Sequence, residues 1–84
     1  MVYQIILSRT AEKDLSKIDK KYKPHIFAAL FDLRKNPHLG KRLKGKFQDC
    51  YSLRVGPYRI IYKVYKRELN ILIIRIGQRQ GAYR

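Results

Sequence analysis

The pattern of apolar and polar residues predicts a short strand and then a helix at the start of the chain. Residues Val2 to Leu7 form a mostly apolar run of strand length. Either Ser8 or Thr10 can then cap a helix, since each side chain carries an oxygen that accepts a backbone hydrogen bond at a helix start. The apolar stripe of this helix comprises Ala11, Leu15 and Ile18.

A charged turn over residues 20–23 separates this helix from a second one. Pro24 suits the first turn of a helix, where its missing N–H costs nothing. Asn36-Pro37 ends the helix, because a residue before proline is biased away from the helical backbone conformation. The buried stripe of this second helix consists of Ile26, Ala29, Leu30 and Leu33.

After residue 38 the apolar residues recur at every second position, which predicts strands. These strands cover residues 51–55, 58–64 and 69–76, with turns at Gly56-Pro57 and at 66–68, and a short additional strand is expected at Arg42 to Gly45. We therefore expect an α+β fold of order β-α-α-β-β-β in one domain, residues 1–84. It has an N-terminal strand, a helical hairpin, and then an antiparallel sheet of three to four strands with both helices on one face.

The first hairpin predicts which side chains share a face of the sheet. If Gly56-Pro57 is a two-residue loop, Val55 pairs with Tyr58 and Arg54 pairs with Arg59. Arg54 and Arg59 then lie opposite each other on the face turned away from the helices, here called the outer face, where like charges destabilise the sheet. The core face carries Tyr51, Leu53, Val55, Tyr58, Ile60, Tyr62 and Val64.

The strand over 69–76 extends the outer face. Its hairpin pairs either Arg59 or Ile61 with Arg75, depending on where the turn falls, and either register adds Arg75 to the arginines. The same alternation places four apolar residues on this face, which favours cover by an amphipathic helix of a partner protein. These four are Ile61, Leu69, Ile71 and Ile73.

The net charge of the chain indicates the class of molecule that it binds. The chain has 20 Lys and Arg against 6 Asp and Glu, a formal net charge of +14, and the excess begins at Leu39. Three arginines on neighbouring strands repel one another unless an anion lies between them, and a guanidinium matches the geometry of a phosphate. The charge therefore favours a polyanion, with RNA as the first choice. A basic surface that serves solubility alone is the alternative.

Other features concern the compartment. Cys50 is the one cysteine, so it can form neither an internal disulfide nor a zinc motif. No signal-peptide pattern follows Met1, and the longest apolar run, Ile71 to Ile74, is too short to cross a bilayer. We expect a cytoplasmic protein with no membrane association.

Three segments together resemble the RelE/ParE toxin superfamily, and its RelE branch most. They are NPHLGKRLKG over 36–45, YSLRVGPYRIIY over 51–62, and IGQR over 76–79 followed by Tyr83. The resemblance covers essentially the whole chain, and the segments are specific as a set. It implies the β-α-α-β-β-β fold and a ribosome-dependent mRNA endonuclease that cuts in the ribosomal A site. It also implies a cognate antitoxin, which the charge of this chain predicts to be acidic.

The resemblance further implies roles for individual residues. Arg54, Arg59 and Arg79 fall on the family's phosphate-binding and transition-state arginines, and Tyr83 falls on its C-terminal tyrosine. The family chemistry uses no metal or other cofactor: the RNA 2′-hydroxyl attacks the adjacent phosphate, which DNA does not allow. Residues expected to contact the RNA are Lys41, Arg42, Lys44, Lys46, Ser52 and Arg75.

Two positions depart from the family pattern, and both concern proton transfer. Ser52 stands where close relatives carry a lysine, a candidate general base, and Gln78 stands where many members carry histidine. Tyr83 then becomes the candidate base, because nearby arginines favour its phenolate form. Lys44 or Lys46 is the candidate acid, and Ser52 either bonds a phosphate oxygen or acts as a spacer.

Two other functions remain open on the sequence. A ParE-like toxin has the same fold and poisons DNA gyrase through protein contact without cutting RNA. The set of Arg54, Arg59, Arg79 and Tyr83 argues against that function. A non-catalytic RNA-binding member of the family would keep the basic surface and lack cleavage.

Overall fold

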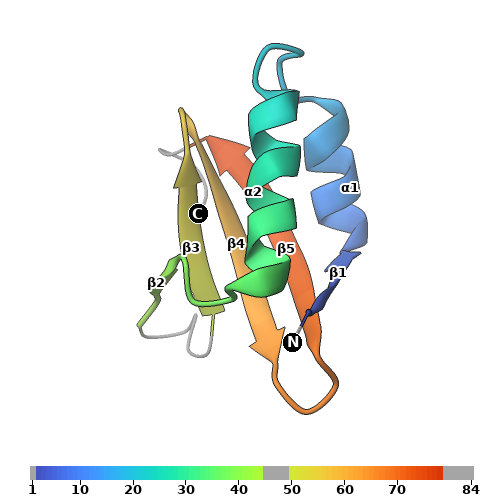
Figure 1. Cartoon of the computed structure of the whole chain (residues 1–84). Helices are drawn as coiled ribbons and strands as arrows, with labels where there is room; N and C mark the ends of the chain where they lie inside the picture. The colour runs from blue at the N-terminus through green and yellow to red at the C-terminus, as the bar shows by residue number, and fades with distance from the viewer. Residues whose placement is uncertain (1, 45–49, 79–84) are drawn as a thin grey trace.

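The computed structural model describes residues 2–44 and 50–78. Within them, helices α1 (Arg9–Ser16) and α2 (Lys23–Lys35) cover one face of a five-stranded sheet (Figure 1). The strands are β1 (Gln4–Leu7), β2 (Lys41–Arg42), β3 (Cys50–Val55), β4 (Tyr58–Tyr65) and β5 (Asn70–Gln78). The expected α+β fold is confirmed. The additional short strand begins one residue earlier than predicted, and the first strand is shorter than predicted.

The strand order is β1-β5-β4-β3-β2, so β1 lies at one edge of the sheet beside β5, the last strand of the described residues. β1 runs parallel to β5, with Gln4 opposite Asn70 and Leu7 opposite Ile73, whereas the other neighbouring strands are antiparallel. The sheet is therefore mixed and not antiparallel throughout. A parallel pair cannot be closed by a hairpin, and the chain between β1 and β5 contains both helices.

The two helices turn the predicted apolar stripes toward the sheet, and the structure decides which of the two candidate residues caps α1. Ser8, not Thr10, is the N-cap: its Oγ accepts a hydrogen bond from the Ala11 amide at 3.0 Å and donates to the Ile74 carbonyl at 2.8 Å. Ile18 is buried although it lies beyond the end of α1. No helix among the described residues has the length and apolar content needed to cross a bilayer.

The first hairpin has the predicted register. Val55 pairs with Tyr58 and Arg54 pairs with Arg59. Gly56 adopts a φ of 59°, which a type II′ turn requires at its first central position and which a side chain would strain. The tyrosines and aliphatic residues predicted for the core face pack against the helices.

A β-bulge changes the prediction for β5. Ile61 pairs with Arg75, whereas Tyr62 pairs with Ile73, so Ile74 is an additional residue on β5 between the two pairs. One additional residue reverses the alternation of side chains beyond it. The prediction that Ile71 and Ile73 lie on the outer face is therefore wrong. The buried core of the sheet contains Tyr58, Ile60, Tyr62, Ile71, Ile73 and Ile76.

The remaining members of the predicted apolar outer face do not form an exposed patch either. Ile61 is on that face but is only 2% exposed. Leu69 precedes β5 in the β4–β5 turn, with a φ of 55° that a residue with a side chain adopts rarely. The four residues from which a covering partner helix was inferred therefore do not form an exposed apolar surface.

Candidate functional site

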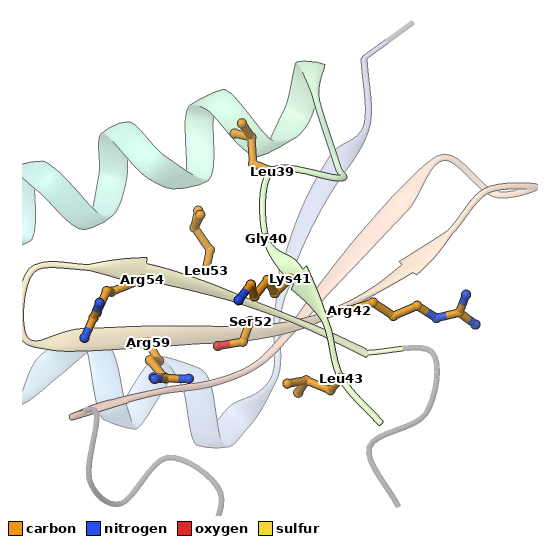
Figure 2. A pocket seen from close by; sticks show the side chains of 9 residues that line it. All are labelled: Leu39, Gly40, Lys41, Arg42, Leu43, Ser52, Leu53, Arg54 and Arg59. Carbon is orange, nitrogen blue, oxygen red and sulfur yellow. The ribbon is translucent and has the colours of Figure 1, made fainter. Parts of the chain in front are cut away.

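A cavity of about 440 Å³ lies where the edge strand β2 meets the β3–β4 hairpin (Figure 2). Its polar lining comes from three neighbouring strands: Lys41 on β2, Ser52 and Arg54 on β3, and Arg59 on β4. The other residues that line it are Leu39, Gly40, Arg42, Leu43 and Leu53. The cavity therefore brings together the arginine pair predicted from the sequence and the beginning of the basic 41–46 segment.

The two arginines of the cavity are directly opposed across β3 and β4. Directly opposed residues of an antiparallel pair have Cβ atoms about 4.5–5.5 Å apart, so both positive charges are held on one side of the sheet. Arg54 is exposed, and Arg59 is partly buried. Their repulsion is relieved when an anion of phosphate geometry lies between them.

Lys41 adds a third cation to this arrangement. The β2–β3 ladder places Lys41 opposite Ser52, and Ser52 in turn is opposite Ile61. Lys41 and Ser52 therefore share the outer face with the two arginines. Figure 2 shows the side chains of Lys41, Ser52 and Arg59 on the same side of the strands.

Arg42 and Lys44, which the sequence grouped with Lys41, are placed differently. Arg42 is opposite Tyr51, a core-face position, and Figure 2 shows its side chain pointing away from the other charged groups. It also lines a second cavity, of about 290 Å³, with Tyr51, Lys63, Val64 and Lys66. Lys44 is exposed and is not among the described residues that line the first cavity.

A buried tyrosine fastens the segment that carries Lys41 to the sheet. The Tyr62 hydroxyl accepts a hydrogen bond from the Gly40 amide at 2.9 Å and donates one to the Pro37 carbonyl at 2.8 Å. Gly40 lies so close that a Cβ atom there would be 2.8 Å from both the Ser52 carbonyl oxygen and the Tyr62 hydroxyl. Only glycine allows this approach without displacement of the chain.

The tyrosine that makes these bonds is held in an aromatic cluster. Its ring stacks on Tyr51 at 5.4 Å between centroids, and His38 contacts the Tyr51 ring edge-on at 5.5 Å. Burial raises the pKa of Tyr62 above its ordinary value, although the hydrogen bond from Gly40 opposes this shift. The hydroxyl therefore stays protonated, and able to donate to Pro37, throughout the neutral pH range.

Arg75 lies apart from the cavity lining. It is opposite Ile61, the second of the two predicted registers, and its Nε is 3.5 Å from the Asp14 carboxylate on α1. The same carboxylate accepts a hydrogen bond from the Ile76 amide at 3.0 Å. Asp14 thus accepts a hydrogen bond from a part of β5 that lies beyond its pairing with β1. Its charge also attracts the Arg75 side chain toward α1.

Three of the residues predicted for the site lie outside the described residues: Lys46, Arg79 and Tyr83. Among the described residues, 2–44 and 50–78, no group of three His, Cys, Asp or Glu side chains is arranged to bind a metal ion. Sequence reasoning did not find the roles of Gly40 and Tyr62. A tyrosine on the core face is a usable signal, because a buried hydroxyl needs a hydrogen-bond partner.

Comparison with known proteins assigns the chain to a family. The family model described as the ParE toxin of the type II toxin–antitoxin system, parDE, matches residues 5–83. The chain belongs to the RelE/ParE toxin family. Toxin RelE of Mycobacterium tuberculosis is 32% identical to this toxin over an alignment of 84 positions, which covers 98% of this chain and 87% of the relative. Toxin RelG of the same organism is 31% identical over 90 residues, covering 100% of this chain and 99% of the relative.

The fold of this RelE/ParE toxin also matches a solved relative. The toxin–antitoxin complex RelBE2 from Mycobacterium tuberculosis contains a chain with a TM-score of 0.87 and 27% identity, covering 94% of this toxin and 93% of that chain. The resemblance found in the sequence is thereby confirmed, and the relatives named RelE and RelG support the RelE-like branch. The protein is a RelE-like toxin of a type II toxin–antitoxin system.

Proposed function

We propose that this toxin is a ribosome-dependent endoribonuclease that cuts mRNA in the ribosomal A site by attack of the RNA 2′-hydroxyl, without a metal. The observation that carries the proposal is the cavity in which Arg54 and Arg59 are directly opposed, with Lys41 and Ser52 on the same face. The relatives named RelE and RelG support this reaction over gyrase poisoning.

The proposed reaction forms one bond at phosphorus and breaks another. The 2′-oxygen attacks the adjacent phosphate and loses its proton to a base. The bond from phosphorus to the 5′-oxygen breaks, and that oxygen takes up a proton. The products are a 2′,3′-cyclic phosphate and a 5′-hydroxyl. Negative charge grows on the non-bridging oxygens in between, and Arg54 and Arg59 are placed to stabilise it.

Arg79 and Tyr83 enter the proposed reaction through the family resemblance. Arg79 supplies a further cation, and Tyr83 takes the 2′-proton because nearby arginines favour its phenolate form. The sequence left Lys44 or Lys46 as the donor of a proton to the leaving oxygen. Ser52 is 8% exposed and lines the cavity, which suits a hydroxyl that bonds a phosphate oxygen. Tyr83→Phe tests the base: it should abolish most cleavage, and undiminished cleavage would remove Tyr83 from that role.

The central test is primer extension on programmed ribosomes incubated with the purified toxin. Wild-type protein should cut the A-site codon, and an mRNA with a 2′-deoxy nucleotide at the cut position should stay intact. Arg54→Ala and Arg59→Ala should each lower the rate about 10²–10³-fold, the cost of removing one preorganised charge-stabilising donor. Arg9→Ala is the matched control, because Arg9 is an exposed arginine at the start of α1.

The same experiment separates the other two functions. Gyrase inhibition without mRNA cutting would identify a ParE-like activity. RNA binding with neither effect would identify a non-catalytic member of the family.

We also propose that the natural partner is an acidic antitoxin that covers the basic surface. The net charge of +14 supports an acidic partner, and the similar RelBE2 structure is of a toxin–antitoxin complex. The candidate antitoxin is the product of the gene next to that of the toxin. Native mass spectrometry should detect a stable complex of the two proteins, and the complex should not cut mRNA. A candidate that binds the toxin without blocking cleavage would contradict the proposal.

A further inference from the structure

The 5′-oxygen that leaves in the proposed reaction needs a proton, and the described residues narrow the choice of donor. Arginine is a poor acid because its guanidinium holds its proton throughout the accessible pH range. Ser52 has no proton to give at comparable acidity. Among the described residues that line the cavity, Lys41 is the only lysine. Of the two candidates named from the sequence, Lys44 is not among them, and Lys46 lies outside the described residues.

The position of Lys41 is determined by backbone pairing and not by the side chain alone. β2 pairs with β3 so that Lys41 is opposite Ser52, two residue pairs along from the opposed Arg54 and Arg59 and on the same face. The pairing continues past β2, since the Leu43 amide donates to the Cys50 carbonyl at 2.8 Å. At the other end of β2, Tyr62 holds Gly40, the neighbour of Lys41, at 2.9 Å. The backbone of Lys41 is therefore fixed on both sides.

We propose that Lys41 is the general acid of this toxin, a role that rests on the proposed cleavage reaction. Its ammonium group gives a proton to the 5′-oxygen as the bond between that oxygen and phosphorus breaks. The resulting neutral amine regains a proton from water after the products leave. The neighbouring residue Arg42 also borders the cavity, but its side chain points away from the other charged groups and takes no part in this step.

Two mRNAs with different leaving groups distinguish whether Lys41 donates a proton or only stabilises negative charge. In an mRNA whose scissile 5′-oxygen is replaced by sulfur, the leaving thiolate needs no proton. Lys41→Gln should slow cleavage of the ordinary mRNA about 10²–10³-fold, within the usual range for general acid catalysis. With the 5′-thio mRNA, Lys41→Gln should cut within about threefold of wild type. Equal defects on both substrates would overturn the proposal.

Three further variants complete the test. Lys41→Arg keeps the charge but not the acidity, so it should bind a 2′-deoxy mRNA on the ribosome as wild type does and still cut slowly. Lys20→Gln removes the same charge from an exposed turn outside the cavity lining and should cut the ordinary mRNA within about threefold of wild type. Adding Ser52→Lys to Lys41→Gln returns an amine from the opposite position. Cleavage of the ordinary mRNA should rise at least tenfold above that of Lys41→Gln alone, and cleavage of the 5′-thio mRNA should stay the same.

The result also distinguishes this inference from the function on which it rests. If wild-type protein cuts no mRNA, the proposed function fails. If wild-type protein cuts and Lys41→Gln cuts the ordinary mRNA equally well, only the role of Lys41 fails. A bell-shaped pH profile for wild type that loses its alkaline limb in Lys41→Gln would support the role independently.

Discussion

The Tyr62 hydroxyl lies 2.9 Å from the Gly40 amide nitrogen and joins the centre of the sheet to the segment that leads into the site. Tyr62 is fully buried on the core face of β4, and Gly40 immediately precedes β2. The same hydroxyl donates to the Pro37 carbonyl, so a single side chain determines how residues 37–40 pass over the sheet. The outer-face site thus depends on a contact made on the opposite face.

Tyr62→Phe should weaken both the fold and the site. It leaves the ring in place and removes the hydrogen bonds to Gly40 and Pro37, which we expect to lower the free energy of unfolding by about 1–2 kcal/mol. Urea unfolding measures this loss, and the Lys41 amide shift in NMR spectra reports the movement of β2. Tyr58→Phe is the control, because its hydroxyl accepts only a 3.4 Å bond from the Asp19 amide. An unshifted Lys41 amide in Tyr62→Phe would show that the hydroxyl does not position β2.

Alkaline pH should release the same contact. Because burial raises the pKa of Tyr62 above its ordinary value of 10.0, the folded protein binds this proton more tightly than the unfolded chain does. The stabilisation is therefore complete below about pH 10 and is lost as the pH rises through the folded-state pKa. The difference in unfolding free energy between wild type and Tyr62→Phe should shrink above that pH. A difference that stays constant from pH 8 to pH 11 would contradict this assignment.

Arg54→Thr should stabilise the protein in the absence of RNA. It removes one of two directly opposed arginines and places a good strand-forming residue at an exposed position. We expect a gain of about 0.5 kcal/mol at low ionic strength, which falls toward zero in 1 M salt as screening increases. Urea unfolding at the two salt concentrations provides the measurement, with Arg67→Thr in the exposed β4–β5 turn as the control. A loss of stability at low salt would show that the arginine pair is already neutralised.

Asp14→Ala should destabilise the edge of β5. The Asp14 carboxylate is 14% exposed and accepts the Ile76 amide hydrogen bond, so its removal leaves that donor unsatisfied, at a cost of about 1.5–3 kcal/mol. Arg75→Ala should cost less than about 0.5 kcal/mol, because its ion pair with Asp14 is half exposed. Asp32→Ala, at an exposed position on α2, is the matched control. Faster hydrogen exchange at Ile76 in Asp14→Ala would locate the effect.

Local patterns were enough to predict the helices and the first hairpin. The stripe of α2 and the stop before Pro37 depend on neighbours within one or two turns, so the sequence shows them directly. The opposed pair of Arg54 and Arg59 follows from a two-residue turn and a strict alternation on both strands. The family resemblance then selected, from many basic residues, those that we propose take part in the reaction.

Long-range pairing decided what the local pattern could not. The alternation on β5 is interrupted at Ile74, and this bulge moves Ile71 and Ile73 into the core. An additional residue in one strand is visible only against its partner strand, which is why period alone misplaced them. The parallel pairing of β1 with β5 likewise joins the first and last strands of the described residues through backbone hydrogen bonds that carry no sequence signature.

Within the basic 41–46 segment, the sequence and the tertiary structure decide different things about the proposed site. The sequence by itself determined that the toxin is strongly basic, and it grouped Lys41, Arg42 and Lys44 as expected RNA contacts. The tertiary structure decided that Lys41 faces the arginines while Arg42 points away. The reason is physical: successive residues of a strand point to opposite faces, and only the pairing of β2 with β3 determines which residue faces the site.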